Sequence, residues 1–185
     1  MSTERNVAQI ALFTALIAAL GLIPQLTLAF GVPITAQSLG IMLCGTVLGA
    51  RRGGLAALLF VALVALGLPL LSGGRGGLGL FSPSSPTVGF LVGFPVSAFC
   101  TGLITERLRR LPTAPAAGIA AVIGGICVLY AFGIVGMSVA LERSLGEAAL
   151  LVTAFIPGDM IKAVLAGLIT AALYRARPDS VWSRA

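Results

Sequence analysis

Histidine is absent from this sequence and charged residues are few, so the chain has few of the side chains that catalysis uses. Charged residues make up 10% of its 185 residues, and there are three cysteines, Cys44, Cys100 and Cys127. Each cysteine lies alone in an apolar run, which excludes the usual ligand spacing of a zinc site and favours free thiols. No nucleophile stands beside a base and no carboxylates are paired. We therefore expect neither an enzyme nor a metal or other cofactor.

Apolar residues dominate what remains, and their amount points to a membrane. They form 58% of the chain, and the mean hydropathy is +1.07, well above that of a soluble domain. The hydrocarbon layer is about 30 Å thick, so each helical crossing takes about 20 residues. We predict one all-α integral membrane domain over residues 1–185, with six transmembrane helices at about residues 7–29, 36–50, 53–71, 87–107, 115–140 and 148–174.

Arginines separate the second and third predicted helices and orient the bundle. Arg51 and Arg52 would each cost about 2.5 to 3.5 kcal/mol at mid-membrane, so a turn is predicted there. Arg5, this pair, the cluster at 107–110 and the C-terminal arginines all alternate onto one side of the membrane. That side should be cytoplasmic, with both termini, by the positive-inside rule. The net charge of +6 is thereby assigned to topology rather than to nucleic-acid binding.

Small residues form a regular strip on the first predicted helix. Ala11, Ala15 and Ala19 recur at intervals of four and therefore share one flat face. Small side chains let helices approach closely in lipid. The strip indicates either packing against a neighbouring helix of the same chain or docking of a partner subunit.

Two ionisable residues lie near the start of the last apolar run, FIPGDMIKAVLAG. Asp159 and Lys162, at i and i+3, share a helix face and can pair while both point into the bundle. Charge inside a membrane segment usually marks a functional site. The alternative is a structural ion pair, although apolar residues would be equally stable there. We predict that this pair binds a ligand.

Two outer segments supply further polar groups. In LLSGGRGGLGLFSPSSP, glycines surround Arg75, which favours a mobile lid whose amides, including those of Gly76 and Gly77, approach a small anion. A flexible connector with an incidental arginine is the alternative. In GVPITAQSLG, Gln37 offers hydrogen-bonding groups that helix capping does not explain. Together with Asp159 and Lys162, these segments predict a site for a small amphipathic ligand.

These motifs resemble those of the BioY family, the biotin-specific S components of energy-coupling factor (ECF) transporters. The resemblance rests on VPITAQSLG, LGARRGGLAALLF, GLPLLSGGRGGLGLFSPSSPTVGFLVGF and FIPGDMIKAVLAG, which occur in family order between residues 32 and 167. The stretch SPSSPTVGF, at the end of the lid, departs from the family pattern.

The resemblance implies a six-helix S-component fold that captures biotin from outside with high affinity. Carried onto matching positions, it places the ureido-ring contacts on Asp159 and Lys162 and the loop contacts on the segments of Gln37 and Arg75. Biotin's carboxylate is assigned to Arg75 and the glycine amides beside it. Another vitamin as the ligand, or a membrane scaffold without a small-molecule ligand, remain the alternatives.

The resemblance also implies partners. S components work with a transmembrane coupling subunit and two cytoplasmic ATPase subunits, which hydrolyse the ATP, and the family's docking surface matches Ala11, Ala15 and Ala19. The expected location is the cytoplasmic (inner) membrane of a prokaryote, in contact with the lipid bilayer. The alternative is a homo-oligomer of this chain that works without these partners.

Overall fold

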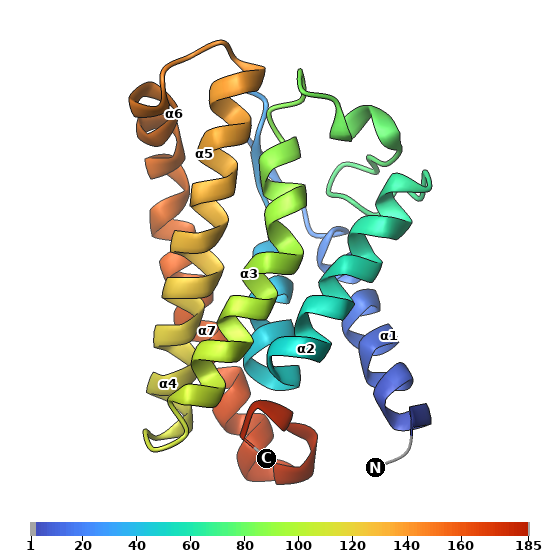
Figure 1. Ribbon diagram of the computed structural model, residues 1–185, viewed down its shortest axis with the longest axis vertical. Coiled ribbons are helices and arrows are strands. Elements are labelled where there is room, and N and C mark those ends of the chain that lie inside the picture. Colours follow the sequence, from blue (N-terminus) through green and yellow to red (C-terminus); the bar gives the residue numbers. More distant parts are fainter. Residues whose placement is uncertain (1–2, 185) are drawn as a thin grey trace.

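The computed structural model describes residues 3–184 as an elongated bundle of helices. The start of α1 and the C-terminal segment lie at the same end of the bundle (Figure 1). The α-helices are α1 (Thr3–Leu20), α2 (Gln37–Ala65), α3 (Val88–Arg107), α4 (Thr113–Ala120), α5 (Leu129–Ala140), α6 (Leu145–Val152) and α7 (Ile156–Ala176). A two-stranded ladder pairs β1 (Leu26–Thr27) with β2 (Pro33–Ile34) in the segment between α1 and α2.

Several helices join into longer stretches. A π-helical segment, Ala121–Val128, connects α4 to α5, and a 3₁₀ turn, Thr153–Phe155, connects α6 to α7. Four stretches of the described chain are long and apolar enough to cross a membrane, namely Gln37–Ala65, Val88–Arg107, Thr113–Ala140 and Leu145–Ala176. The bundle therefore has the composition of a membrane-embedded protein.

The first helix is shorter than predicted. It ends at Leu20, and the residues that continue the apolar run to position 29 form a turn and strand β1. Gly21 lies so close to the chain after α2 that a Cβ there would be 2.5 Å from the Leu70 carbonyl oxygen. Pro24 follows, and proline disfavours a helical conformation in the residue before it. The prediction rests on hydropathy, which reflects neither the close packing at Gly21 nor the effect of Pro24.

The second and third predicted helices are the two arms of α2. Gly49 interrupts the helix with φ 81° and ψ −176°, a backbone conformation that favours glycine. A Cβ at Gly53 would lie 2.5 Å from the carbonyl oxygen of Cys44, so the chain reverses and its arms pack together. The reversal comes slightly earlier than predicted, and Arg51 and Arg52 begin the second arm. The carboxylate of Glu106 accepts a hydrogen bond from the Ala50 N–H in this turn, at 2.9 Å.

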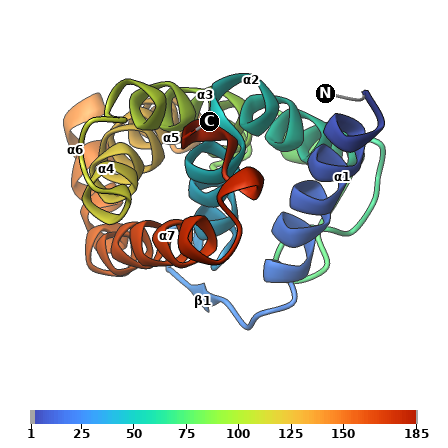
Figure 2. The same cartoon turned by 90° about the horizontal axis from the view of Figure 1, so that it is seen from below.

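The helix α1 lies at one edge of the bundle. Figure 2 shows it beside α2, with α4, α6 and α7 on the opposite side. Only Thr14 and Ile17 of α1 are buried, and the Thr14 hydroxyl donates to the carbonyl oxygen of Ala56 in the second arm of α2. Ala11, Ala15 and Ala19 are exposed. Within the described residues, the strip is therefore not used for packing against a neighbouring helix.

The C-terminal segment, residues 178–184, folds under the bundle instead of leaving it. Val181, Trp182 and Ser183 are buried. The guanidinium of Arg52 lies 3.4 Å from the centroid of the Trp182 ring, and that of Arg5 lies 5.4 Å away. Cation–π contacts of this kind stabilise both arginines at this end of the bundle. The segment thus joins the start of α1 to the reversal in α2.

Candidate functional site

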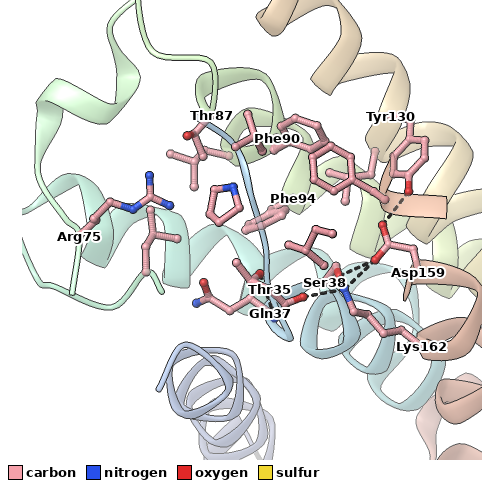
Figure 3. Close-up of a pocket in the computed structure, with 17 residues that line it drawn as sticks. Thr35, Gln37, Ser38, Arg75, Thr87, Phe90, Phe94, Tyr130, Asp159 and Lys162 are labelled. Atoms are coloured by element: carbon pink, nitrogen blue, oxygen red, sulfur yellow. Dashed lines mark hydrogen bonds and ion pairs between the residues drawn. The ribbon is translucent and has the colours of Figure 1, made fainter. Parts of the chain in front are cut away.

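A cavity lies at the end of the bundle opposite the termini. The first turns of α2, α3 and α7, the start of α5 and the two outer segments surround it (Figure 3). It is lined by Val32, Pro33, Ile34, Thr35, Gln37, Ser38, Leu71, Arg75, Thr87, Phe90, Leu91, Phe94, Leu129, Tyr130, Phe155, Asp159 and Lys162. Both members of the predicted ion pair and Arg75 therefore face one cavity.

The ion pair forms one end of the cavity. Asp159 and Lys162 stand one turn apart on α7, and Nζ lies 2.7 Å from Oδ1. Asp159 is in the first turn of α7, where the helix dipole favours negative charge, and it is 5% exposed. Pro157 fits the same turn because its missing N–H would have no helical partner there. The local sequence thus fixes a buried carboxylate at a helix start.

Neighbouring elements hold this pair in place. The Lys162 ammonium donates to the Thr35 carbonyl oxygen at 2.6 Å and to the Ser38 hydroxyl at 2.9 Å, in addition to Asp159. Ser38 donates to Asp159 Oδ1 at 3.1 Å, and the Tyr130 hydroxyl donates to Oδ2 at 2.8 Å. An ammonium has three protons, and all of them are used. The carboxylate, with about four acceptor positions, retains room for a ligand donor.

Sequence reasoning missed the contribution of Tyr130. From the sequence, Thr35 and Ser38 offer hydrogen-bonding groups that capping of the second predicted helix could also explain, but the Thr35 contact uses a backbone carbonyl that no side-chain pattern reveals. Tyr130 did carry a signal, because it is one of two tyrosines in the chain and lies in the middle of an apolar run. A buried tyrosine hydroxyl usually needs a partner.

Aromatic rings form the walls of the cavity. Phe90 and Phe94 come from α3, and Phe155 lies at the start of α7. The Phe155 ring contacts those of Phe90 and Tyr130 edge-on, with centroids 5.9 Å and 6.4 Å apart. Such walls exclude water and suit an apolar ring system.

Arg75 marks the end of the cavity opposite the ion pair (Figure 3). Its Nε donates to the Ser72 carbonyl oxygen at 3.2 Å, which fixes the side chain against its own loop. Within residues 3–184 its two terminal nitrogens have no hydrogen-bond partner. Burial lowers the pKa of the guanidinium, but an arginine remains a cation at neutral pH. This end can therefore receive an anionic group.

The remaining predicted residues have other contacts. Gln37 lies at the cavity edge, where its Nε2 donates to the carbonyl oxygens of Ile17 and Leu70 and its Oε1 accepts from the Ser72 N–H. It ties α1, α2 and the glycine-rich loop together.

The prediction for Gly76 and Gly77 differs from the structure, since neither residue lines the cavity. Gly76 packs on the Leu68 carbonyl, and the Gly77 N–H donates to the Val64 carbonyl oxygen at 2.7 Å. This packing turns both backbones towards the end of α2.

The cavity is narrow. Its free volume is about 60 Å³, whereas pockets for drug-sized ligands have roughly 300 to 1,000 Å³. A ligand of that size can enter only when part of the wall moves outward. The glycine-rich loop after α2 is the wall best suited to move, because it belongs to no α-helix and its glycines give the backbone the greatest conformational freedom.

Fold and site together define a membrane-embedded helical bundle that binds a small amphipathic ligand. A hydrogen-bonding ion pair, aromatic walls and a guanidinium whose terminal nitrogens have no partner among residues 3–184 follow one another along one cavity. The comparisons with known proteins agree with this class. The chain belongs to the BioY family, whose model matches residues 1–179.

Relatives and a solved structure cover nearly the whole chain. The biotin transporter BioY of Rhodobacter capsulatus is 53% identical over 190 residues, covering 98% of this chain and 99% of that one. The biotin transporter BioY of Rhizobium etli is 53% identical and covers 91% and 92%. A crystal structure of the S-component for biotin from an ECF-type ABC transporter superposes with a TM-score of 0.87, at 29% identity and 95% coverage of both chains. These relatives are transporters, which confirms the prediction that the chain is not an enzyme.

Proposed function

We propose that this chain captures biotin with high affinity and carries it across the membrane as the S component of an ECF-type importer. One observation supports this best. The cavity has a hydrogen-bonding ion pair at one end and an arginine with free N–H groups at the other, separated by aromatic walls. Biotin has the matching order of groups, with a ureido ring, an apolar middle and a terminal carboxylate.

The ureido ring binds at Asp159 and Lys162. One of its N–H groups donates to the carboxylate, which has about one acceptor position left after Lys162, Ser38 and Tyr130 have donated. Its carbonyl oxygen accepts from the ammonium, which must give up one of its three present partners. The Thr35 carbonyl is the partner that leaves, since the other two keep the pair itself together.

The valerate carboxylate binds at Arg75. A guanidinium offers parallel N–H groups to a carboxylate, and such charge-assisted pairs are stronger than neutral hydrogen bonds. Gln37 holds the Arg75 loop through Ser72 and Leu70, so it contributes by positioning rather than by direct contact. Gly76 and Gly77 contribute through the flexibility of the loop.

The same helices support the proposed membrane arrangement. Counting both arms of α2 and the joined stretches α4–α5 and α6–α7 as spans, together with α1 and α3, gives the proposed six crossings. The arginine-rich end lies in the cytoplasm with both termini, and the cavity opens outward. The proposed location is the inner membrane of a prokaryote.

The exposed strip of Ala11, Ala15 and Ala19 docks the transmembrane coupling subunit. Two cytoplasmic ATPase subunits supply the energy through ATP hydrolysis. Accumulation against a gradient requires coupling to an energy source. A homo-oligomer that delivers biotin alone is the alternative arrangement.

Isothermal titration of the ligand-free protein in detergent tests the proposal. We expect saturable binding of biotin with a Kd near the nanomolar range, about −12 kcal/mol, and none of thiamine. Equal affinity for thiamine would indicate another vitamin, and no binding to a folded sample would indicate a scaffold. Lys162, the only lysine of the chain, adds an independent readout. Biotin should protect it from an amine-reactive reagent.

A further inference from the structure

A groove on the outside of the bundle is separate from the biotin cavity. It runs between the second arm of α2 and α3, with a volume of about 490 Å³, and its sides include Leu55, Leu58, Val96 and Phe99. Leu55 and Leu58 are each about half exposed. Gly54 forms its floor, because a Cβ there would lie 3.3 Å from the Phe99 Cβ. The groove therefore presents a continuous apolar surface to the membrane.

One end of the groove is charged. Arg51 lines the groove and also lines a second hollow of about 630 Å³ beside the reversal of α2, which shares Phe99 and adds Arg52 and Glu106. This hollow lies at the end of the bundle that carries the termini, as the contact of Arg52 with Trp182 requires. An apolar trough thus leads directly into a polar hollow at the membrane boundary.

The charged side chains in the hollow differ in the contacts that they make. The Arg52 guanidinium stacks on Trp182 and donates to Asn6 Oδ1 at 3.1 Å. One oxygen of Glu106 accepts from the Ala50 N–H. Arg51 is exposed and, within residues 3–184, its side chain makes no hydrogen bond or ion pair. The hollow therefore combines a free guanidinium with a carboxylate that is only partly used.

We propose that this groove and hollow bind a membrane glycerophospholipid with an ammonium headgroup, such as phosphatidylethanolamine. One acyl chain lies in the trough between α2 and α3, the phosphate pairs with Arg51, and the ammonium approaches Glu106. A guanidinium binds phosphate oxygens through parallel N–H groups. A purely anionic headgroup fits less well, because Glu106 would repel it. This site is independent of biotin capture.

Native mass spectrometry of the delipidated protein tests the proposal. The protein is incubated with phosphatidylethanolamine, phosphatidylglycerol or diacylglycerol, and the retained lipid is counted. We expect phosphatidylethanolamine to be retained best and diacylglycerol, which lacks the phosphate, least. Arg51→Gln should reduce retention of phosphatidylethanolamine about tenfold. Arg110→Gln, at an exposed arginine outside both hollows, is the matched control and should retain the lipid.

Glu106→Gln tests the headgroup assignment. The glutamine oxygen can still accept from the Ala50 N–H, so the turn is kept while the charge is removed. We expect the preference for phosphatidylethanolamine over phosphatidylglycerol to disappear, with biotin affinity unchanged as proof of folding. Equal loss of lipid in the Arg51 and Arg110 variants would mean unspecific boundary lipid and would overturn the site. An unchanged preference in the Glu106 variant would overturn the ammonium headgroup.

Discussion

Replacing Lys162 by methionine should weaken biotin binding by about 2 to 5 kcal/mol. Methionine keeps most of the apolar stem and removes the ammonium, which donates to Asp159, Ser38 and the Thr35 carbonyl. The Asp159 carboxylate would remain buried without its counter-ion, and the ligand's carbonyl would lose its donor. The expected change corresponds to roughly a 30- to 5,000-fold higher Kd.

A double-mutant cycle shows whether the pair acts as one unit. Biotin affinity is measured by titration calorimetry for Lys162→Met, Asp159→Asn and the double variant, with Arg175→Gln as a control cation outside the cavity. Each single variant leaves one buried group without its partner, whereas the double variant removes both charges. The double variant should therefore lose less than the sum of the single losses, by at least about 1 kcal/mol.

Two results would refute this reasoning. Near-native affinity in folded Lys162→Met protein would mean that the ammonium does not contact the ligand. Additive losses in the cycle would mean that Asp159 and Lys162 act separately, in spite of the 2.7 Å between Oδ1 and Nζ. A thermal unfolding scan in the same detergent distinguishes lost binding from lost folding.

Tyr130→Phe should weaken biotin binding about tenfold through loss of a hydrogen bond to a charged group, whereas Tyr174→Phe, outside the cavity, should not. Arg75→Gln should lower the affinity for biotin but not for biotin amide, and equal losses in calorimetry would contradict the carboxylate assignment. Trp182→Ala should lower the free energy of unfolding by about 3 kcal/mol while biotin affinity is kept, and an unchanged unfolding temperature would argue against the C-terminal contact. Ala15→Leu should leave biotin affinity intact but reduce uptake in vesicles that contain the coupling and ATPase subunits. Loss of both would indicate misfolding instead.

Local signals predicted the parts of this structure that depend on neighbours in sequence. The i, i+3 spacing of Asp159 and Lys162 places them on one face of a helix. The cost of burying Arg51 and Arg52 likewise requires a turn close to where Gly49 provides it. Both inferences need only helix geometry and the free-energy cost of placing a charged side chain in lipid.

Contacts between distant segments could not be predicted in the same way. Gln37 was expected to face a ligand, but backbone carbonyls from α1 and the loop after α2 occupy its amide. The end of α1 depends on the close approach of Leu70 to Gly21. Such contacts depend on how the chain folds back on itself, which hydropathy and spacing do not specify.

The charges around the ligand cavity also have an electrical consequence. Asp159 and Lys162 cancel, so Arg75 supplies the net charge of the residues that line it. A carboxylate bound to Arg75 makes the loaded cavity neutral, whereas without that anion the cavity is cationic. Moving one elementary charge through the membrane potential changes the free energy by about 2.3 kcal/mol for about 100 mV. In the proposed transport cycle, the membrane potential therefore acts on the movement of the empty, cationic cavity and leaves the movement of the loaded, neutral cavity unaffected.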